Sequence, residues 1–186
     1  YFKIGNYTQS NAEREGDYTD DPDNYGEVVV YDFWVDHSES SVTPSPTPTT
    51  PTPSPSGSEI DSIITDGEVW DLEGDDPNPL VDPYTLVFVP LEAQYTSPNG
   101  NGWRHEYKIA TDQRVAMSAT YEKLTATVTV DMSDGGKTII SQHHASDLGT
   151  IMKLYVADTN ESGFYDSVAD NGVFDVYVRM LNTSGS

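Results

Sequence analysis

Apolar and polar residues alternate with a period of two along most of the chain, which predicts β-strands with one apolar face. Within 123–131, Leu124, Ala126, Val128 and Val130 form that face and lie opposite three threonines. No segment has the 3.6-residue period of a helix. Strands are therefore predicted at 1–9, 27–36, 62–71, 84–90, 103–110, 123–131, 137–144, 150–157 and 173–181.

The predicted strands are short, and turn sequences such as SPNGNG, MSDGGK and DNG separate them. In the last strand the apolar face consists of Phe174, Val176, Val178 and Met180. Many short strands joined by turns of this kind predict an all-β fold, either a β-sandwich or a jelly roll.

One segment, 40–58, divides the chain. Its proline residues alternate with serine and threonine, which predicts an extended, semi-rigid linker with a reach of roughly 60 Å. The predicted organisation is therefore a first strand unit at 1–39, the linker at 40–58 and the remaining strands at 59–186. Ser/Thr-Pro linkers are common in exported proteins, so a secreted or extracellular location is expected.

Composition narrows the classes of function. The chain has 186 residues with 12 Tyr and no Cys, which suits one domain without disulfide or thiol chemistry. Its net charge of -22 argues against binding to nucleic acid or to an anionic membrane surface. No apolar run reaches the length needed to span a bilayer. Because only nine Lys and Arg are present, their positions are informative.

The first candidate for chemistry is WRHEYK at 103–108. Alternation places Arg104, Glu106 and Lys108 on one strand face, with His105 and Tyr107 on the other. Two cations oriented by a carboxylate make a site for an anion. The alternative is a solvent-exposed strand with ordinary salt bridges.

The second candidate is SQHH at 141–144. Gln142 and His144 share a face and suit hydrogen bonding to a carboxylate or proton transfer near neutral pH. The remaining histidines, His37 and His105, are scattered, and no HExxH motif is present, which argues against zinc. The alternative is a polar pair at a strand end.

These segments, together with YFKIGNYTQ at 1–9, resemble the signature segments of the alginate lyases of polysaccharide lyase families seven and eighteen. The matching motifs are R-x-E-x-K at 104–108, Q-x-H at 142–144 and YFK-x-G-x-Y-x-Q at 1–9. The run TIMKLYVADT at 150–159 also resembles family eighteen. The resemblance implies a concanavalin-like β-jelly roll.

The order of the segments departs from that family. There the YFK segment lies near the C-terminus, and a few more strands precede it. Two explanations stay open. The chain is a circular permutant, with the linker joining the old termini, or it combines the end of one lyase domain with the start of another and completes its sheets with a second chain.

The resemblance implies β-elimination on alginate or a related anionic polysaccharide. Arg104, Gln142 and His144 would neutralise the uronate carboxylate. Tyr7 would act as base, acid or both, and His144 would be the base for the other uronate epimer. The residues implied to bind the polymer are Lys108, Lys3, Glu106, Lys153, Tyr155 and Gln9. The alternative function is a polyuronate-binding module without turnover, and a third is a structural adhesion fragment.

No cofactor is expected to be required. Calcium is considered at Asp158-x-Asn160-x-Ser162-Gly163, which matches the first half of an EF-hand loop but lacks the final Glu. A hairpin turn is the favoured interpretation there. The acidic stretch 13–26 is likewise interpreted as a solvated loop in preference to a calcium site.

Overall fold

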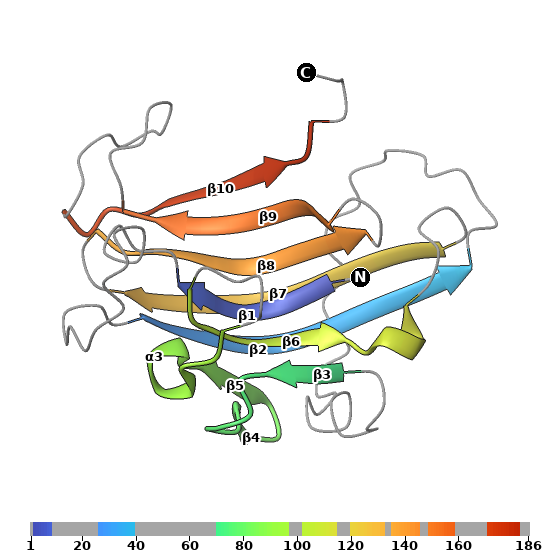
Figure 1. The fold of residues 1–186 in the computed structure, drawn as a ribbon, viewed down its shortest axis with the longest axis horizontal. Helices are drawn as coiled ribbons and strands as arrows, with labels where there is room; N and C mark the ends of the chain where they lie inside the picture. Colours follow the sequence, from blue (N-terminus) through green and yellow to red (C-terminus); the bar gives the residue numbers. More distant parts are fainter. Residues whose placement is uncertain are drawn as a thin grey trace.

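The structure is a computed structural model that describes residues 2–8, 26–39, 70–96, 102–114, 120–132, 135–145, 149–158 and 171–182. These residues form two antiparallel sheets, with almost no helix (Figure 1). The six-stranded sheet has the order β10-β9-β8-β1-β6-β3, and the four-stranded sheet has the order β4-β5-β2-β7. The strands are β1 (Phe2–Thr8), β2 (Gly26–Glu39), β3 (Trp70–Glu73), β4 (Leu80–Asp82), β5 (Thr85–Phe88), β6 (Arg104–Ile109), β7 (Thr120–Met132), β8 (Lys137–Ala145), β9 (Gly149–Ala157) and β10 (Asp175–Met180).

This architecture confirms the predicted β-sandwich, and a strand lies within or across every predicted range. Among the described residues, three short elements were missed: β4, the helical turn α3 (Pro90–Ala93) and the 3-10 turn Thr111–Gln113. Elements of three or four residues are too short to show a period. Of the strand predicted at 62–71, only the end is described, as the start of β3, because 62–69 lie outside the described residues.

The segments before and after the predicted linker share both sheets. β1 lies between β8 and β6, and β2 lies between β5 and β7, so each is an inner strand (Figure 1). The linker itself, 40–58, lies outside the described residues. The first strand of the chain therefore lies inside a sheet, with neighbours that are about 100 residues or more away in sequence.

Gly5 allows β1 and β6 to approach closely. Its φ is +152°, and a Cβ added there would lie 2.4 Å from both the Glu106 Cα and the His105 carbonyl oxygen. A side chain at this position would therefore push the two strands apart. The glycine of the YFK-x-G segment therefore has a packing role beside the candidate residue Glu106.

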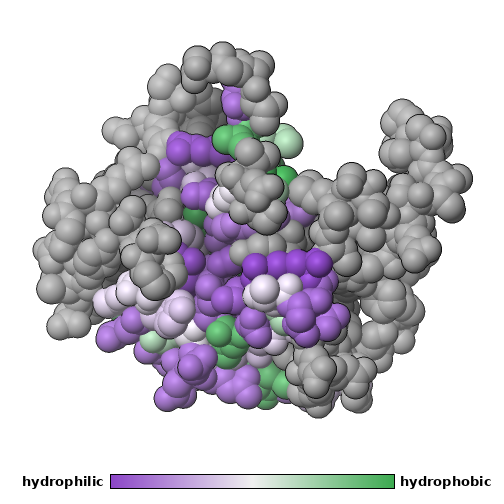
Figure 2. All heavy atoms as spheres, turned by 45° about the vertical axis from the view of Figure 1, so that its right-hand side comes forward, coloured by the Kyte–Doolittle hydropathy of each residue, from purple (hydrophilic) through white to green (hydrophobic). Residues whose placement is uncertain are grey.

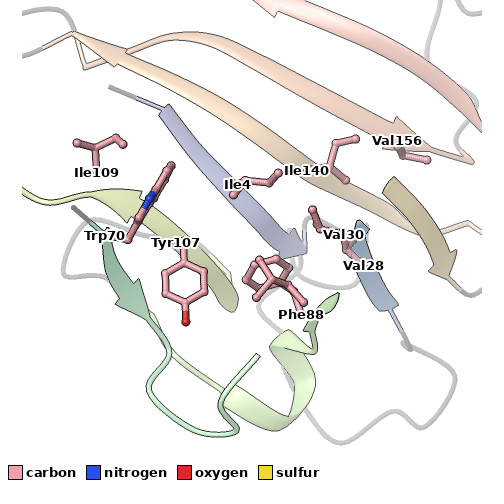
Figure 3. Close-up of a cluster of buried hydrophobic side chains, with 10 residues drawn as sticks. Ile4, Val28, Val30, Trp70, Phe88, Tyr107, Ile109, Ile140 and Val156 are labelled. Atoms are coloured by element: carbon pink, nitrogen blue, oxygen red, sulfur yellow. The ribbon is translucent and has the colours of Figure 1, made fainter. Parts of the chain in front are cut away.

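The core lies between the two sheets (Figure 3). Phe88 of β5 and Val30 of β2 belong to the same buried hydrophobic cluster as Ile4, Ile109 and other residues of the six-stranded sheet. Alternation predicted this face correctly in β7, where 124, 126, 128 and 130 are half-buried and pack against the cluster. These contacts supply most of the apolar burial that holds the sheets together.

Asn6 links the sheets with polar contacts inside this core. Its Nδ2 donates to the Gly26 carbonyl at 3.1 Å, and its Oδ1 accepts from the Thr138 hydroxyl. The side chain is fully buried, so these bonds replace those it would make with water. They fix the position of β1 relative to β2 and β8.

The apolar face of β10 departs from the expectation that such a face is turned toward the core. Val176, Val178 and Met180 are 67%, 51% and 75% exposed. β10 is the outer strand of its sheet, and no strand of the other sheet lies behind it among the described residues (Figure 1). A cavity of about 230 Å³ lies nearby between the sheets, lined by Ile4, Leu124, Ala126, Val128, Ile140, Ser141, Met152 and Leu154.

Among the described residues, no helix is long and apolar enough to cross a membrane.

The exposure of β10 gives a stability prediction, because Val176 lies directly opposite the buried Val156 in the β9–β10 register. We expect Val156→Ala to lower the free energy of unfolding by about 2 kcal/mol, through lost burial and the cavity left behind. Val176→Ala should cost less than about 1 kcal/mol. Urea unfolding of the two variants tests this, and equal losses would show that another segment or a second chain covers this face.

Candidate functional site

Three segments separated in sequence meet on one face of the six-stranded sheet. In the β1–β6 register, Lys3 lies opposite Lys108 and Tyr7 opposite Arg104. In the β1–β8 register, Lys3 lies opposite Gln142. The pairing thus brings together the three candidate motifs at 1–9, 104–108 and 142–144, with Gln142 on the face that alternation predicted. A register shift between His143 and His144 interrupts the alternation of β8 before His144.

Glu106 is the centre of this group. Its carboxylate accepts hydrogen bonds from Lys3 Nζ at 2.9 Å and from Gln142 Nε2 at 3.0 Å. Arg104 NH1 lies 3.4 Å from the same carboxylate. Glu106 is 2% exposed, so the alternative of an ordinary solvent-exposed salt bridge on β6 is wrong.

Glu73 of β3 is the residue that sequence reasoning missed. Its carboxylate lies 2.5 Å from Lys3 Nζ, 3.1 Å from Lys108 Nζ and 3.5 Å from Arg104 NH1. Alternation does place Glu73 on the same face as Asp71, but it does not say that β3 pairs with β6. Glu73 and Glu106 together surround Lys3 with negative charge.

Burial and the neighbouring charges shift the pKa values of Lys3, Glu73 and Glu106 in opposite directions. Burial alone would lower the pKa of Lys3, but the Glu106 and Glu73 carboxylates outweigh it and raise that pKa above its usual value. Burial alone would raise the pKa of Glu73, but contact with Lys3 and Lys108 holds it at about 2. Complete burial raises the pKa of Glu106, against the effects of Lys3 and Arg104.

Tyr7 lies against Arg104. The guanidinium carbon is 4.3 Å from the centre of the Tyr7 ring, a cation–π contact. Tyr7 is 6% exposed and packs with Ile139 and Tyr155 in a small apolar cluster. The structure therefore brings the proposed base beside the proposed carboxylate ligand.

His144 lies at the other end of the strands. Tyr7 pairs with Ile139, whereas the neighbour of His144, His143, pairs with Phe2. At about 3.3 Å per residue, Tyr7 and His144 are roughly 15 Å or more apart along the strands. The two residues therefore lie at different positions along the strands.

The surroundings of His144 favour its neutral form at neutral pH. Burial, and then the positive charge of Lys3, lower its pKa to about 4. The hydroxyl of Thr150 lies 3.3 Å from its Nε2. A neutral imidazole has an acceptor nitrogen at neutral pH.

Two other predicted binding residues lie on β9. Lys153 is directly opposite Gln142, and Tyr155 is opposite Ile139, so both share the face that carries the charged cluster. Gln9 lies outside the described residues.

His105 points to the opposite face. It accepts a hydrogen bond from the Val89 backbone N–H at its Nδ1, 2.9 Å away, and its ring packs edge-on against Phe88. Burial lowers its pKa to about 4. It is a core residue that ties β6 to the second sheet.

No group of three or more His, Cys, Asp or Glu suited to a metal ion occurs in the part of the chain that the structure describes. Asp158 Oδ2 accepts hydrogen bonds from the backbone N–H groups of Gly135, Asn171 and Gly172. This carboxylate therefore organises two loops. Asn160, Ser162 and Gly163 of the considered calcium site lie outside the described residues, so that site stays a prediction.

Comparison with known proteins gives the family. A family model described as alginate lyase matches residues 48–185, about three-quarters of the chain. The chain belongs to this alginate lyase family. The matched region contains the Arg104–Glu106 and Gln142–His144 segments. It begins after β1 and β2 and does not include them.

Two solved structures of the alginate lyase kind are similar to the chain. An alginate lyase from Alteromonas sp. 272 is 61% identical over 69% of this chain, with a TM-score of 0.58. A polysaccharide lyase of family 18, aly-SJ02 r-CATD, is 62% identical over 67% of this chain, with a TM-score of 0.56. The chain spans only 56% and 55% of those two structures. A search of curated proteins found no match.

The low pKa of His144 gives a prediction. We expect its ring protons to titrate near pH 4 in NMR spectra, well below the usual 6.5, with the resonances assigned by comparison with His144→Gln. Since the unfolded chain binds this proton near pH 6.5, the folded state loses stability as the pH falls from about 6.5 to about 4. A midpoint near 6.5 would contradict the burial described above.

The ion pairs of Glu73 give a second prediction. Glu73→Gln removes one of the two carboxylates that compensate the buried Lys3 and Arg104, so we expect a loss of about 3 kcal/mol in unfolding free energy at pH 7. Asp71→Asn is the matched control, because Asp71 is an exposed residue on the same face of β3. It should change stability by less than about 0.5 kcal/mol.

Urea unfolding of both variants at several pH values measures these losses. The stability that Glu73 contributes is fully present above about pH 4.5 and is lost as the pH falls through about 2. The difference from the wild type should shrink over that range. Equal effects of the two substitutions at pH 7 would contradict a role for Glu73 in holding the cluster.

Proposed function

We propose that this protein is an alginate lyase that cleaves a polyuronate chain by β-elimination. The observation that carries the proposal is the convergence of Lys3, Arg104 and Gln142 on one sheet face around a buried carboxylate. A cluster that already orients donors toward one carboxylate is suited to hold a second, that of the substrate. Membership of the alginate lyase family supports this choice of substrate.

Arg104 is the proposed main ligand of the uronate carboxylate. Its contacts with Glu73 and Glu106 are long, at 3.5 and 3.4 Å, and its buried Nε has no hydrogen-bond partner among the described residues. The guanidinium therefore keeps donor capacity in the planar geometry that suits a carboxylate. Gln142 and Lys3 would add donors from the neighbouring strands.

The chemistry requires charge neutralisation. The proton to be removed is on the carbon next to the uronate carboxylate, and it is weakly acidic. As it leaves, negative charge builds on that carboxylate, and the ligands named above would stabilise it. The bond from the next ring carbon to the glycosidic oxygen then breaks, a carbon–carbon double bond forms, and the oxygen takes up a proton.

Tyr7 is the proposed base and acid because it contacts Arg104. His144 is the proposed base for the other uronate epimer and would act at a different position along the groove, given its distance from Tyr7. Lys108, Lys153 and Tyr155 would contact neighbouring sugars, and Glu106 would orient the cations. We propose no cofactor, and a secreted or extracellular location in keeping with a polysaccharide substrate.

A polyuronate-binding module without turnover is the second candidate. The observation in its favour is the exposed apolar face of β10, where a second chain would complete the sandwich.

Ultraviolet absorbance during incubation with alginate tests the proposal directly. Elimination produces a double bond conjugated to a carboxylate, so we expect the absorbance to rise with time. A flat trace with retained binding of alginate would support the binding module and reject the lyase.

Substitution of the tyrosines tests the mechanism. We expect Tyr7→Phe to lower kcat at least a hundredfold with little change in binding, because only proton transfer is lost. Tyr1→Phe is the comparison, since alternation gives Tyr1 the same strand face as Tyr7 and Lys3. Near-wild-type activity of Tyr7→Phe would remove Tyr7 from the mechanism.

A further inference from the structure

Two rows of side chains cross the six-stranded sheet at right angles to its strands. Direct pairing places Lys108 opposite Lys3, Lys3 opposite Gln142, Gln142 opposite Lys153, and Lys153 opposite Arg179. We name these five residues, which are four cations and the neutral Gln142, the cation row. The second row, in the same registers, is Arg104, Tyr7, Ile139, Tyr155 and Tyr177.

Without nearby carboxylates, the cation row would destabilise the folded state. Like charges directly opposite each other in a sheet are destabilising. Glu73 and Glu106 offset the repulsion at Lys3 and Lys108. On the other side of Gln142, burial lowers the pKa of Lys153, and the positive charges of Arg104 and Arg179 lower it further. Lys153 therefore lies in the positive field of two guanidinium groups, and a field of that sign attracts anions.

The Arg179 side chain is held by aromatic rings. Its guanidinium carbon lies 5.3 Å from the centre of the Tyr155 ring and 5.6 Å from that of Tyr177. The two rings stack at 4.9 Å with an angle of 4° between their planes. Arg179 itself is exposed, whereas Tyr155 is buried. A guanidinium fixed in this way loses little freedom when it binds a carboxylate.

We propose that Arg179, positioned by the stacked Tyr155 and Tyr177, binds the carboxylate of a uronate unit distant from the bond that is cleaved. Three strand spacings separate β1 from β10, a distance of about 14 Å. That exceeds one sugar ring, so only longer substrates reach Arg179. Lys137 and Asp175 flank this position on the same face; Lys137 Nζ lies 5.3 Å from the Tyr155 ring centre.

The inference rests on the proposed function for its substrate class, and it predicts a dependence on chain length. For Arg179→Gln, we expect kcat/KM on long alginate oligosaccharides to fall about three- to fivefold, the size of one exposed charge contact. On the shortest cleavable oligosaccharides it should be unchanged. The matched control is Lys123→Gln, which removes an exposed cation from β7 in the other sheet and should leave kcat/KM unchanged at all lengths.

Binding measured on the same oligosaccharides separates this inference from the proposed function. If the wild type shows no elimination, its dissociation constants still test Arg179, and a weaker affinity of Arg179→Gln for long oligosaccharides alone would uphold the site. Tyr177→Leu should show the same length dependence as Arg179→Gln, because it removes one of the two rings that position Arg179. Wild-type behaviour of Arg179→Gln at every length, or an equal loss at all lengths, would overturn the proposal.

Discussion

The burial of Glu106 is the constraint on which the rest of the site depends. An ionised carboxylate removed from water is costly unless donors replace its hydration. Those donors come from three strands: Lys3 on β1, Arg104 on β6 and Gln142 on β8. Because they must reach one point, the three strands are held in a single register. Gly5 completes this arrangement, since any larger residue would separate β1 from the backbone of Glu106.

The same constraint explains how an acidic protein can offer a cationic surface. The net charge is -22, yet six of the nine Lys and Arg share one face of the six-stranded sheet in the described part of the chain. These are Lys3, Arg104, Lys108, Lys137, Lys153 and Arg179. The net charge acts over distances that salt screens, about 8 Å at physiological ionic strength. At this sheet face, the nearby cations therefore dominate the potential.

Alternation along the strands gave the local part of this picture. It placed Arg104, Glu106 and Lys108 on one face of β6 and His105 on the other, and it placed Gln142 with His144. Alternation within one strand does not say which distant segment pairs with that strand. Glu73 was missed because nothing in its own sequence says that β3 lies beside β6. For the same reason, the distance between Tyr7 and His144 became visible only with the β1–β8 register.

β10 shows how the place of a strand in the sandwich overrides its sequence pattern. Its alternation is as regular as that of β7, and both strands are at the edge of a sheet. The apolar face of β7 is covered because the six-stranded sheet lies across from it, whereas that of β10 extends beyond the smaller sheet. The opposite face of β10 carries Arg179 and Tyr177 and continues the charged surface. One edge strand therefore combines an exposed apolar face with the outer end of the charged surface, so a change in the packing of the first face acts on the backbone that holds the second.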